Sequence, residues 1–207
     1  MLISGFPAEL WNTWSNLVII AFGVAALWTV WKRSPRSYGL YWLSFLVAAT
    51  GVGSFLWHGL REPWALTMDT LPGGMVLLTF VYLWARSFYT FVGAGAFLAL
   101  FFGASFLMMS LGRGSLPFFV SLTPVVIMFA ALLINKTKGV SPGLALQGCI
   151  VVACALVALT FRSVDGYACE FIPMGTHFLW HMFLSLSAFL GIRLLLSIES
   201  SLADRYR

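Results

Sequence analysis

The sequence predicts an all-α membrane protein, a single domain over residues 1–207 that forms a bundle of seven transmembrane helices. The first reason is composition: 60% of the residues are hydrophobic, 9% are charged, and the mean hydropathy is +0.93. Soluble domains carry charged residues at about 25%, so this composition excludes a soluble fold. The second reason is length, because an apolar helix needs about 20 residues to cross the hydrocarbon and the chain holds seven such stretches.

Charged and turn-forming residues separate the seven apolar stretches from one another. Seven helices of the required length use about 150 residues, which leaves only short loops and tails. We expect the helices over about 10–31, 38–59, 64–85, 90–110, 115–134, 142–161 and 174–196.

Basic residues set the expected orientation, because the cytoplasmic loops of membrane proteins are enriched in lysine and arginine. If successive helices alternate in direction, nine basic residues fall on the side of the C-terminus and three on the other side. We therefore expect the N-terminus outside and the C-terminus in the cytoplasm, and the net charge of +5 requires no nucleic-acid partner. The nine residues are Lys32, Arg33, Arg36, Arg86, Lys136, Lys138, Arg193, Arg205 and Arg207, and the three are Arg61, Arg113 and Arg162.

Four ionisable side chains lie inside these apolar stretches: His58, Asp69, His177 and His181. An unpaired carboxylate inside a membrane costs about 2.5–3.5 kcal/mol, so each of the four is a candidate functional residue. His177 and His181 are four residues apart and share one face of a helix, and Ser54 has the same spacing from His58. For Asp69, Arg61 or a bound metal ion is the expected partner.

The expected topology brings these residues to one end of the bundle. His58 lies at the outer end of the second helix, Asp69 lies about two turns into the third, and the other histidines lie in the first turns of the seventh. At 1.5 Å per residue, all of them lie within about 15 Å of the outer surface. A structural role is the alternative for each residue alone, since a membrane histidine can bond a neighbouring helix and Ser54 can serve packing. Convergence from three helices favours a functional site.

Three imidazoles and one carboxylate fit a catalytic zinc site. Catalytic zinc takes three protein ligands and keeps a fourth position for water, and the three histidines are the candidate ligands. Zinc lowers the pKa of its bound water to about 7, and Asp69 is the candidate general base for that water. The Ser54 hydroxyl could orient a ligand or donate a hydrogen bond to an oxyanion.

Segments of four expected helices resemble the alkaline ceramidase family. Residues 9–16 are similar to the Glu-x-x-x-x-x-Ser-Asn opening of the family's first helix, and residues 54–69 match its Ser-x-x-x-His…Asp spacing. Residues 177–181 match its His-x-x-Trp-His motif, and the adiponectin receptors share this layout more distantly. The resemblance implies an intramembrane zinc amidase that cleaves an N-acyl lipid such as ceramide. It implies zinc ligands at His58, His177 and His181, a water-binding base at Asp69, and a polar support at Ser54.

The resemblance leaves an alternative function and a question about calcium. The alternative is a seven-helix lipid-binding receptor of the adiponectin-receptor type with little or no turnover. Eukaryotic ceramidases bind calcium through an acidic N-terminal segment together with the first-helix glutamate, and of that set only Glu9 is present here. We therefore do not expect calcium regulation. For Glu9 we expect a role at the positive start of the first helix, with contact to the zinc ligands as the alternative. For Asn12, Ser15 and Asn16, bonds within the helix bundle and a role in the site are equally favoured.

Other classes of membrane protein fit less well. A retinal-binding protein needs a lysine inside a helix, whereas the lysines of this chain lie at the expected loops. A b-type haem would use two histidines and leave the third histidine and Asp69 without a role. A transporter is expected to show internal repeats and broken helices near the midplane, and neither is evident in the sequence.

Overall fold

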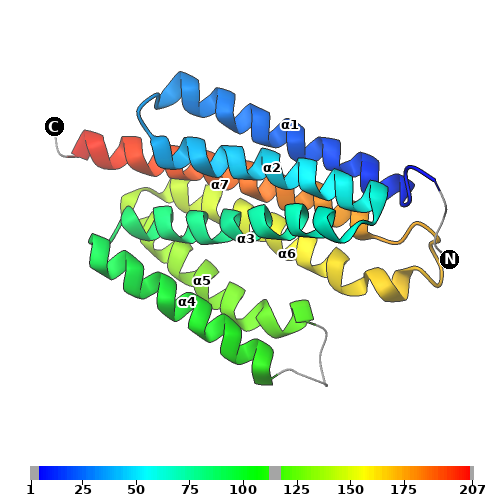
Figure 1. Ribbon diagram of the computed structural model, residues 1–207. Helices are drawn as coiled ribbons and strands as arrows, with labels where there is room; N and C mark the ends of the chain where they lie inside the picture. The colour runs from blue at the N-terminus through cyan, green and yellow to red at the C-terminus, as the bar shows by residue number, and fades with distance from the viewer. Residues whose placement is uncertain (1–4, 112–117, 206–207) are drawn as a thin grey trace.

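The computed structural model describes residues 5–111 and 118–205, and every regular element within them is an α-helix (Figure 1). This confirms the all-helical prediction, and the described residues contain the expected number of helices. In chain order the helices are α1 (Leu10–Arg33), α2 (Tyr38–Leu60), α3 (Pro63–Arg86), α4 (Phe91–Leu111), α5 (Phe118–Val140), α6 (Pro142–Ala168) and α7 (His177–Arg205).

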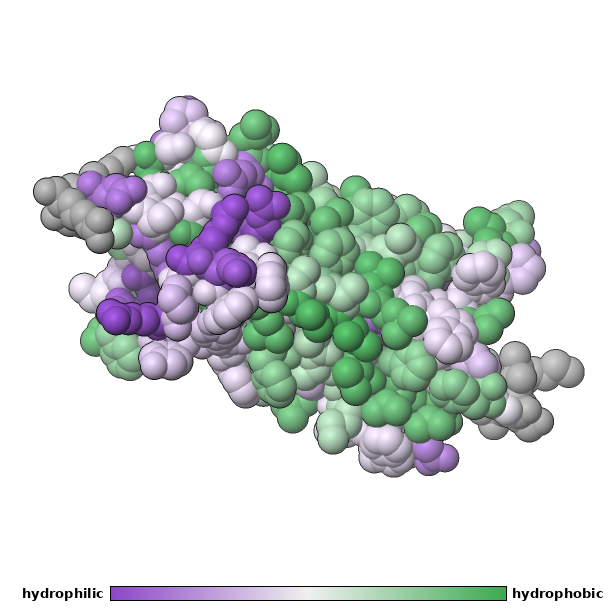
Figure 2. All heavy atoms as spheres, turned by 90° about the horizontal axis from the view of Figure 1, so that it is seen from above, coloured by the Kyte–Doolittle hydropathy of each residue, from purple (hydrophilic) through white to green (hydrophobic). Residues whose placement is uncertain are grey.

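Six of these helices, all except α5, are long and apolar enough to cross a membrane. The side chains of residues 118–123 in α5 lie outside the described part of the chain, so the count of seven spans stays a prediction. The surface over α1 carries a broad hydrophobic band, with hydrophilic residues gathered toward one end (Figure 2). The chain is a multi-pass membrane protein. Of the basic residues behind the expected orientation, Arg113 and Arg207 lie outside the described residues.

The observed helices differ from the expected spans chiefly in α5, α6 and α7. The helices α5, α6 and α7 continue to Val140, Ala168 and Arg205, beyond the expected ends at 134, 161 and 196. Hydropathy marks where the apolar stretch stops, whereas a helix stops only where capping or breaking residues occur. The start of α7 is three residues later than expected, because Gly175 adopts a φ of +65° just before His177. Such a left-handed residue interrupts a right-handed helix.

Glycines bring α1, α2 and α3 into close contact. A Cβ atom added at Gly23 of α1 would lie 2.5 Å from the backbone nitrogen of Ala48 in α2. A Cβ atom added at Gly53 of α2 would overlap the carbonyl oxygen of Met68 in α3. Small residues are enriched at membrane helix contacts because they let backbones approach this closely. These contacts fix how the end of α2 faces the start of α3.

The arrangement of the helices places the start of α1, the end of α2 and the start of α7 at the same end of the bundle (Figure 1). The helix α1 packs against both α2 and α7, and α6 packs against α7. The end of α7 lies at the opposite end of the bundle (Figure 1). The bundle therefore holds residues 9–16, 58 and 177–181 next to one another.

Away from the site, Trp84 of α3 is fully buried, and the rings of Phe88, Phe97 and Phe129 contact it.

Candidate metal centre

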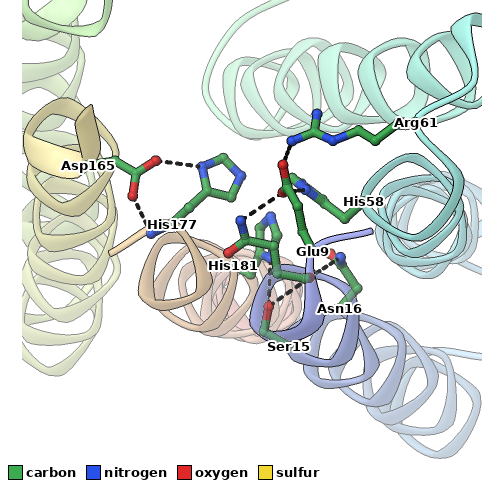
Figure 3. A network of polar contacts seen from close by, with 9 residues as sticks. Glu9, Ser15, Asn16, His58, Arg61, Asp165, His177 and His181 are labelled. Carbon is green, nitrogen blue, oxygen red and sulfur yellow. Dashed lines mark hydrogen bonds and ion pairs between the residues drawn. The ribbon is translucent and has the colours of Figure 1, made fainter. Parts of the chain in front are cut away.

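The three histidines lie together where α2 ends and α7 begins (Figure 3). His58 is in the last turn of α2, His177 is the first residue of α7, and His181 follows one turn later. Their ring centroids are 4.6–5.0 Å apart, and one nitrogen of each ring lies within 4.8 Å of those of the other two. The exposed fractions of His58 and His181 are 4% and 3%. The expected convergence of the histidines is thus observed.

Two of the imidazole rings are oriented by carboxylates at their Nδ1 atoms. His58 Nδ1 lies 2.6 Å from Glu9 Oε2, and His177 Nδ1 lies 3.7 Å from Asp165 Oδ2. The Glu9 contact is within hydrogen-bond distance, so it favours the proton of His58 on Nδ1 and the lone pair on Nε2. The Asp165 contact is within ion-pair distance of His177 but is longer than a hydrogen bond. Metal-binding histidines in proteins are held by outer partners of this kind.

The third ring, that of His181, is held by a hydroxyl group. Its Nδ1 atom lies 2.8 Å from Ser15 Oγ, and the Ser15 hydroxyl donates to the Asn12 carbonyl at 3.0 Å. A serine hydroxyl has one proton to donate, so Ser15 Oγ is left to accept the proton of His181 Nδ1. Ser15 therefore takes part in the site as well as in the helix, and His181 also keeps its lone pair on Nε2.

Glu9 connects several groups around His58. The same Oε2 atom accepts a hydrogen bond from Asn12 Nδ2 at 2.9 Å, and Oε1 pairs with the guanidinium group of Arg61. The backbone N–H of Glu9 donates to the His58 carbonyl at 3.1 Å. Glu9 does lie at the start of α1, but its side chain makes no capping hydrogen bond there. The carboxylate contacts a candidate metal ligand, which was the alternative expectation.

The partner of Arg61 corrects one expectation. Arg61 or a bound metal ion was the expected partner of Asp69, but the structure pairs Arg61 with Glu9. Arg61 caps α2 with a left-handed φ of 58°, and its guanidinium group stacks over the Trp57 ring at 4.6 Å. The backbone thus turns at Arg61 and the side chain lies toward α1.

Asp165, near the end of α6, holds the start of α7. Its Oδ1 atom accepts the backbone N–H groups of Thr176 at 2.7 Å and His177 at 2.9 Å. The first turn of a helix leaves such N–H groups unpaired, and a negative charge there is favourable. A Cβ atom added at Gly175 would lie 2.5 Å from Asp165 Oδ1. Glycine is therefore required at 175 both by this approach and by its positive φ.

Sequence reasoning missed Asp165 because it ended the sixth helix at 161. The signal that could have found it is an acidic residue beyond an apolar span and 12 positions before the first of two histidines. Acids are rare in this chain, with seven in 207 residues, so each one near a histidine segment is informative.

Ser54 and Asp69 face each other across the contact between α2 and α3. The Ser54 hydroxyl lies next to the Asp69 carboxylate and interacts with it, and Asp69 also interacts electrostatically with His58. Ser54 is buried and Asp69 is half-buried. Within the described residues, the tight group of potential metal ligands contains the three histidines and not Asp69. Asp69 therefore lies beside the histidine cluster, and the roles assigned to it and to Ser54 stay predictions.

The donor set fits a divalent transition metal ion such as zinc. One nitrogen atom of each imidazole lies close to those of the other two, and catalytic zinc sites use three protein ligands with a fourth position open. Asp69 is outside this group of potential ligands, so its carboxylate lies nearby without being a ligand. The fold and this centre define the class: a multi-pass helical membrane protein with a histidine cluster suited to a metal ion.

The chain belongs to the ceramidase family, because the family model described as Ceramidase matches residues 2–207. This confirms the family that the sequence motifs resemble. No curated protein matches the chain. Membership in the family makes the chain a ceramidase-like hydrolase of amide bonds, and it implies a lipid substrate.

The two contacts of Asp165 can be separated by substitution. Asp165→Asn keeps an oxygen acceptor for the N–H groups of Thr176 and His177 but loses the charge, and Asp165→Ala loses both. We expect the alanine variant to lower the free energy of unfolding by about 1–2 kcal/mol and the asparagine variant by about 0.3–1 kcal/mol. Unfolding in detergent followed by circular dichroism measures both. Wild-type stability of the alanine variant would show that the contact does not hold α7.

Proposed function

We propose that the protein is a zinc-dependent amidase that cleaves the N-acyl bond of ceramide or a related N-acyl lipid. The observation that carries this proposal is the cluster of three histidines, each with an oxygen atom near Nδ1, in a chain of the ceramidase family. Imidazole ligands with one open position favour zinc over calcium or magnesium, which prefer oxygen ligands. When bound, zinc supplies a water molecule with a pKa near 7 as the nucleophile.

The residues of the chain have distinct roles in this proposal. The Nε2 atoms of His58, His177 and His181 hold the ion. Asp69 accepts the proton of the attacking water and passes it to the nitrogen of the leaving amine. The water oxygen forms a bond to the carbonyl carbon, the C–N bond breaks, and a fatty acid and an amine result. Ser54 orients Asp69 through a hydrogen bond, or it donates to the oxyanion of the acyl group.

We also propose that the centre faces the outer leaflet and that the lipid enters laterally from it. The histidine end of the bundle is the end where the described chain begins, and the opposite end carries most of the basic residues of the positive-inside pattern. Large apolar side chains such as Met68 and Leu71 of α3 are 55% and 60% exposed near Asp69 in the sequence. A lipid substrate can reach such a surface without leaving the membrane.

The metal and the base can be tested separately. We expect His181→Ala to lose the bound metal, because one of three ligands is removed, and Asp69→Asn to keep the metal but lose turnover. Elemental analysis of the purified proteins measures zinc. Fatty-acid release from a panel of ceramides and other N-acyl lipids measures turnover.

Two results would contradict this proposal. Unchanged zinc content in His181→Ala would remove the histidine cluster as the metal site. Zinc in the wild-type protein without release of fatty acid from any lipid of the panel would favour the receptor-type alternative.

The Ser54 hydroxyl gives a second test. We expect Ser54→Ala to weaken catalysis by about 1–3 kcal/mol, the scale of one lost hydrogen bond to a reacting or catalytic group, with zinc content unchanged. Ser44→Ala is the matched control. Ser44 is a fully buried serine of the same helix, and in the described structure its hydroxyl donates only to the backbone carbonyl of Leu40, one turn earlier. Wild-type rates in Ser54→Ala would return Ser54 to a packing role.

The orientation can be tested with a natural reporter. Cys169 is exposed and lies at the C-terminal cap of α6, at the histidine end of the bundle. We expect a membrane-impermeant maleimide to label it in intact cells, and Cys169→Ser to lose this labelling. Labelling of Cys169 only after the cells are opened would place the histidine end in the cytoplasm.

A further inference from the structure

A hollow of about 250 Å³ opens between α1 and α7, far from the histidines. It is lined by Trp28, Thr29, Lys32 and Arg33 of α1 and by Phe189 and Arg193 of α7. At 1.5 Å per residue, Arg193 lies about 24 Å along α7 from His177, so the hollow is separate from the metal centre. Hydrophilic residues gather toward this end of the surface, next to the hydrophobic band (Figure 2).

The charge of the hollow is entirely positive. Lys32, Arg33 and Arg193 line it, and no acidic residue does. Within the described residues, none of these three cations has a carboxylate within ion-pair distance. A positive-inside bias explains basic residues at this end of the bundle but not their convergence from two helices. Cations gathered in this way repel one another unless an anion lies between them.

Aromatic rings hold two of the cations at the rim of the hollow. Lys32 Nζ lies 5.0 Å from the centroid of the Trp28 ring and 4.6 Å from that of Trp31. Arg193 Cζ lies 5.8 Å from the centroid of Phe189. Tryptophan prefers the level of lipid headgroups, so the cations lie at that level too.

An apolar strip of α1 continues from the hollow toward the middle of the bundle. Trp28 and Val24 are one helical turn apart and are 60% and 55% exposed. Leu17 of the same helix, two turns further on, is 48% exposed. The hollow therefore combines a cationic end with an apolar surface beside it, as an anionic lipid requires.

We propose that this hollow binds the phosphate headgroup of an anionic phospholipid, whose acyl chains lie along Trp28 and Val24. The planar guanidinium of Arg193 matches phosphate oxygens in a forked geometry, and the Lys32 ammonium adds a point charge. Basic hollows between transmembrane helices are suited to anionic headgroups. A soluble phosphate would leave the apolar strip of α1 unused, so the observations favour the lipid.

The experiment uses the full chain in phosphatidylcholine nanodiscs with rising fractions of phosphatidylglycerol at fixed salt. Binding to the folded state raises Tm, so we expect a Tm that rises and saturates. In Arg193→Gln the half-saturating fraction should rise about tenfold or more, because a charge-assisted hydrogen bond is lost. Lys138→Gln is the matched control: it removes one charge at the same end of the bundle but outside the hollow, and a shift of no more than about fivefold is expected.

Three outcomes would overturn the proposal. Equal shifts in the two variants would show diffuse attraction to the surface rather than a site. A Tm of the wild-type protein that does not respond to phosphatidylglycerol would show that no anionic lipid binds. A Tm rise of the same size from soluble glycerol phosphate in phosphatidylcholine nanodiscs would assign the hollow to a free phosphate. If Arg193→Gln is unstable in phosphatidylcholine alone, Lys32→Gln replaces it, with the same expected loss.

Discussion

The candidate metal centre depends on the oxygen atoms that hold three imidazole rings through Nδ1. In apolar surroundings an imidazole that lacks such a partner is costly to bury, and its orientation is undefined. Glu9 and Ser15 supply two of the oxygens from the first turns of α1, and Asp165 supplies the third from α6. The three histidines themselves belong to α2 and α7. Four helices must therefore be in place before three nitrogen atoms can face one point.

Close backbone packing provides that placement. Gly53 allows α3 to approach α2 where Ser54 meets Asp69, and Gly175 allows the chain to pass against Asp165 before α7 begins. At each position a larger side chain would push apart groups whose separation is only a few ångströms. The apolar interior gives these polar groups no alternative partners, so small displacements there are costly. Gly53 and Gly175 thus control the distances between neighbouring polar groups, although they have no side chain in the site themselves.

The sequence could predict those features of the protein that follow from the free-energy cost of placing polar groups in a membrane. That cost identified His58, His177 and His181, and alternating helices placed them at one end of the bundle. The spacing in the sequence could mark Asp165 as a candidate, but the contact with His177 and the pairing of Arg61 with Glu9 depend on helix rotation and on the path of a loop, which the sequence does not give. The ends of α6 and α7 were missed because hydropathy reports burial in lipid and not the continuation of a helix. The number of spans and the orientation stay predictions.

One consequence follows from the double role of Asp165. A single carboxylate both accepts the first N–H groups of α7 and lies beside the ring of His177. A displacement of residues 169–176 would therefore also change the position of that ring. A lipid headgroup that pushed this connection aside would tilt the imidazole of His177 and move it relative to His58 and His181. On the flank formed by α3, Asp69 interacts with the His58 ring only electrostatically, and among the described contacts it does not also hold the backbone at the start of a helix. Approach along α3 would therefore disturb the histidine cluster less than approach over the α6–α7 connection.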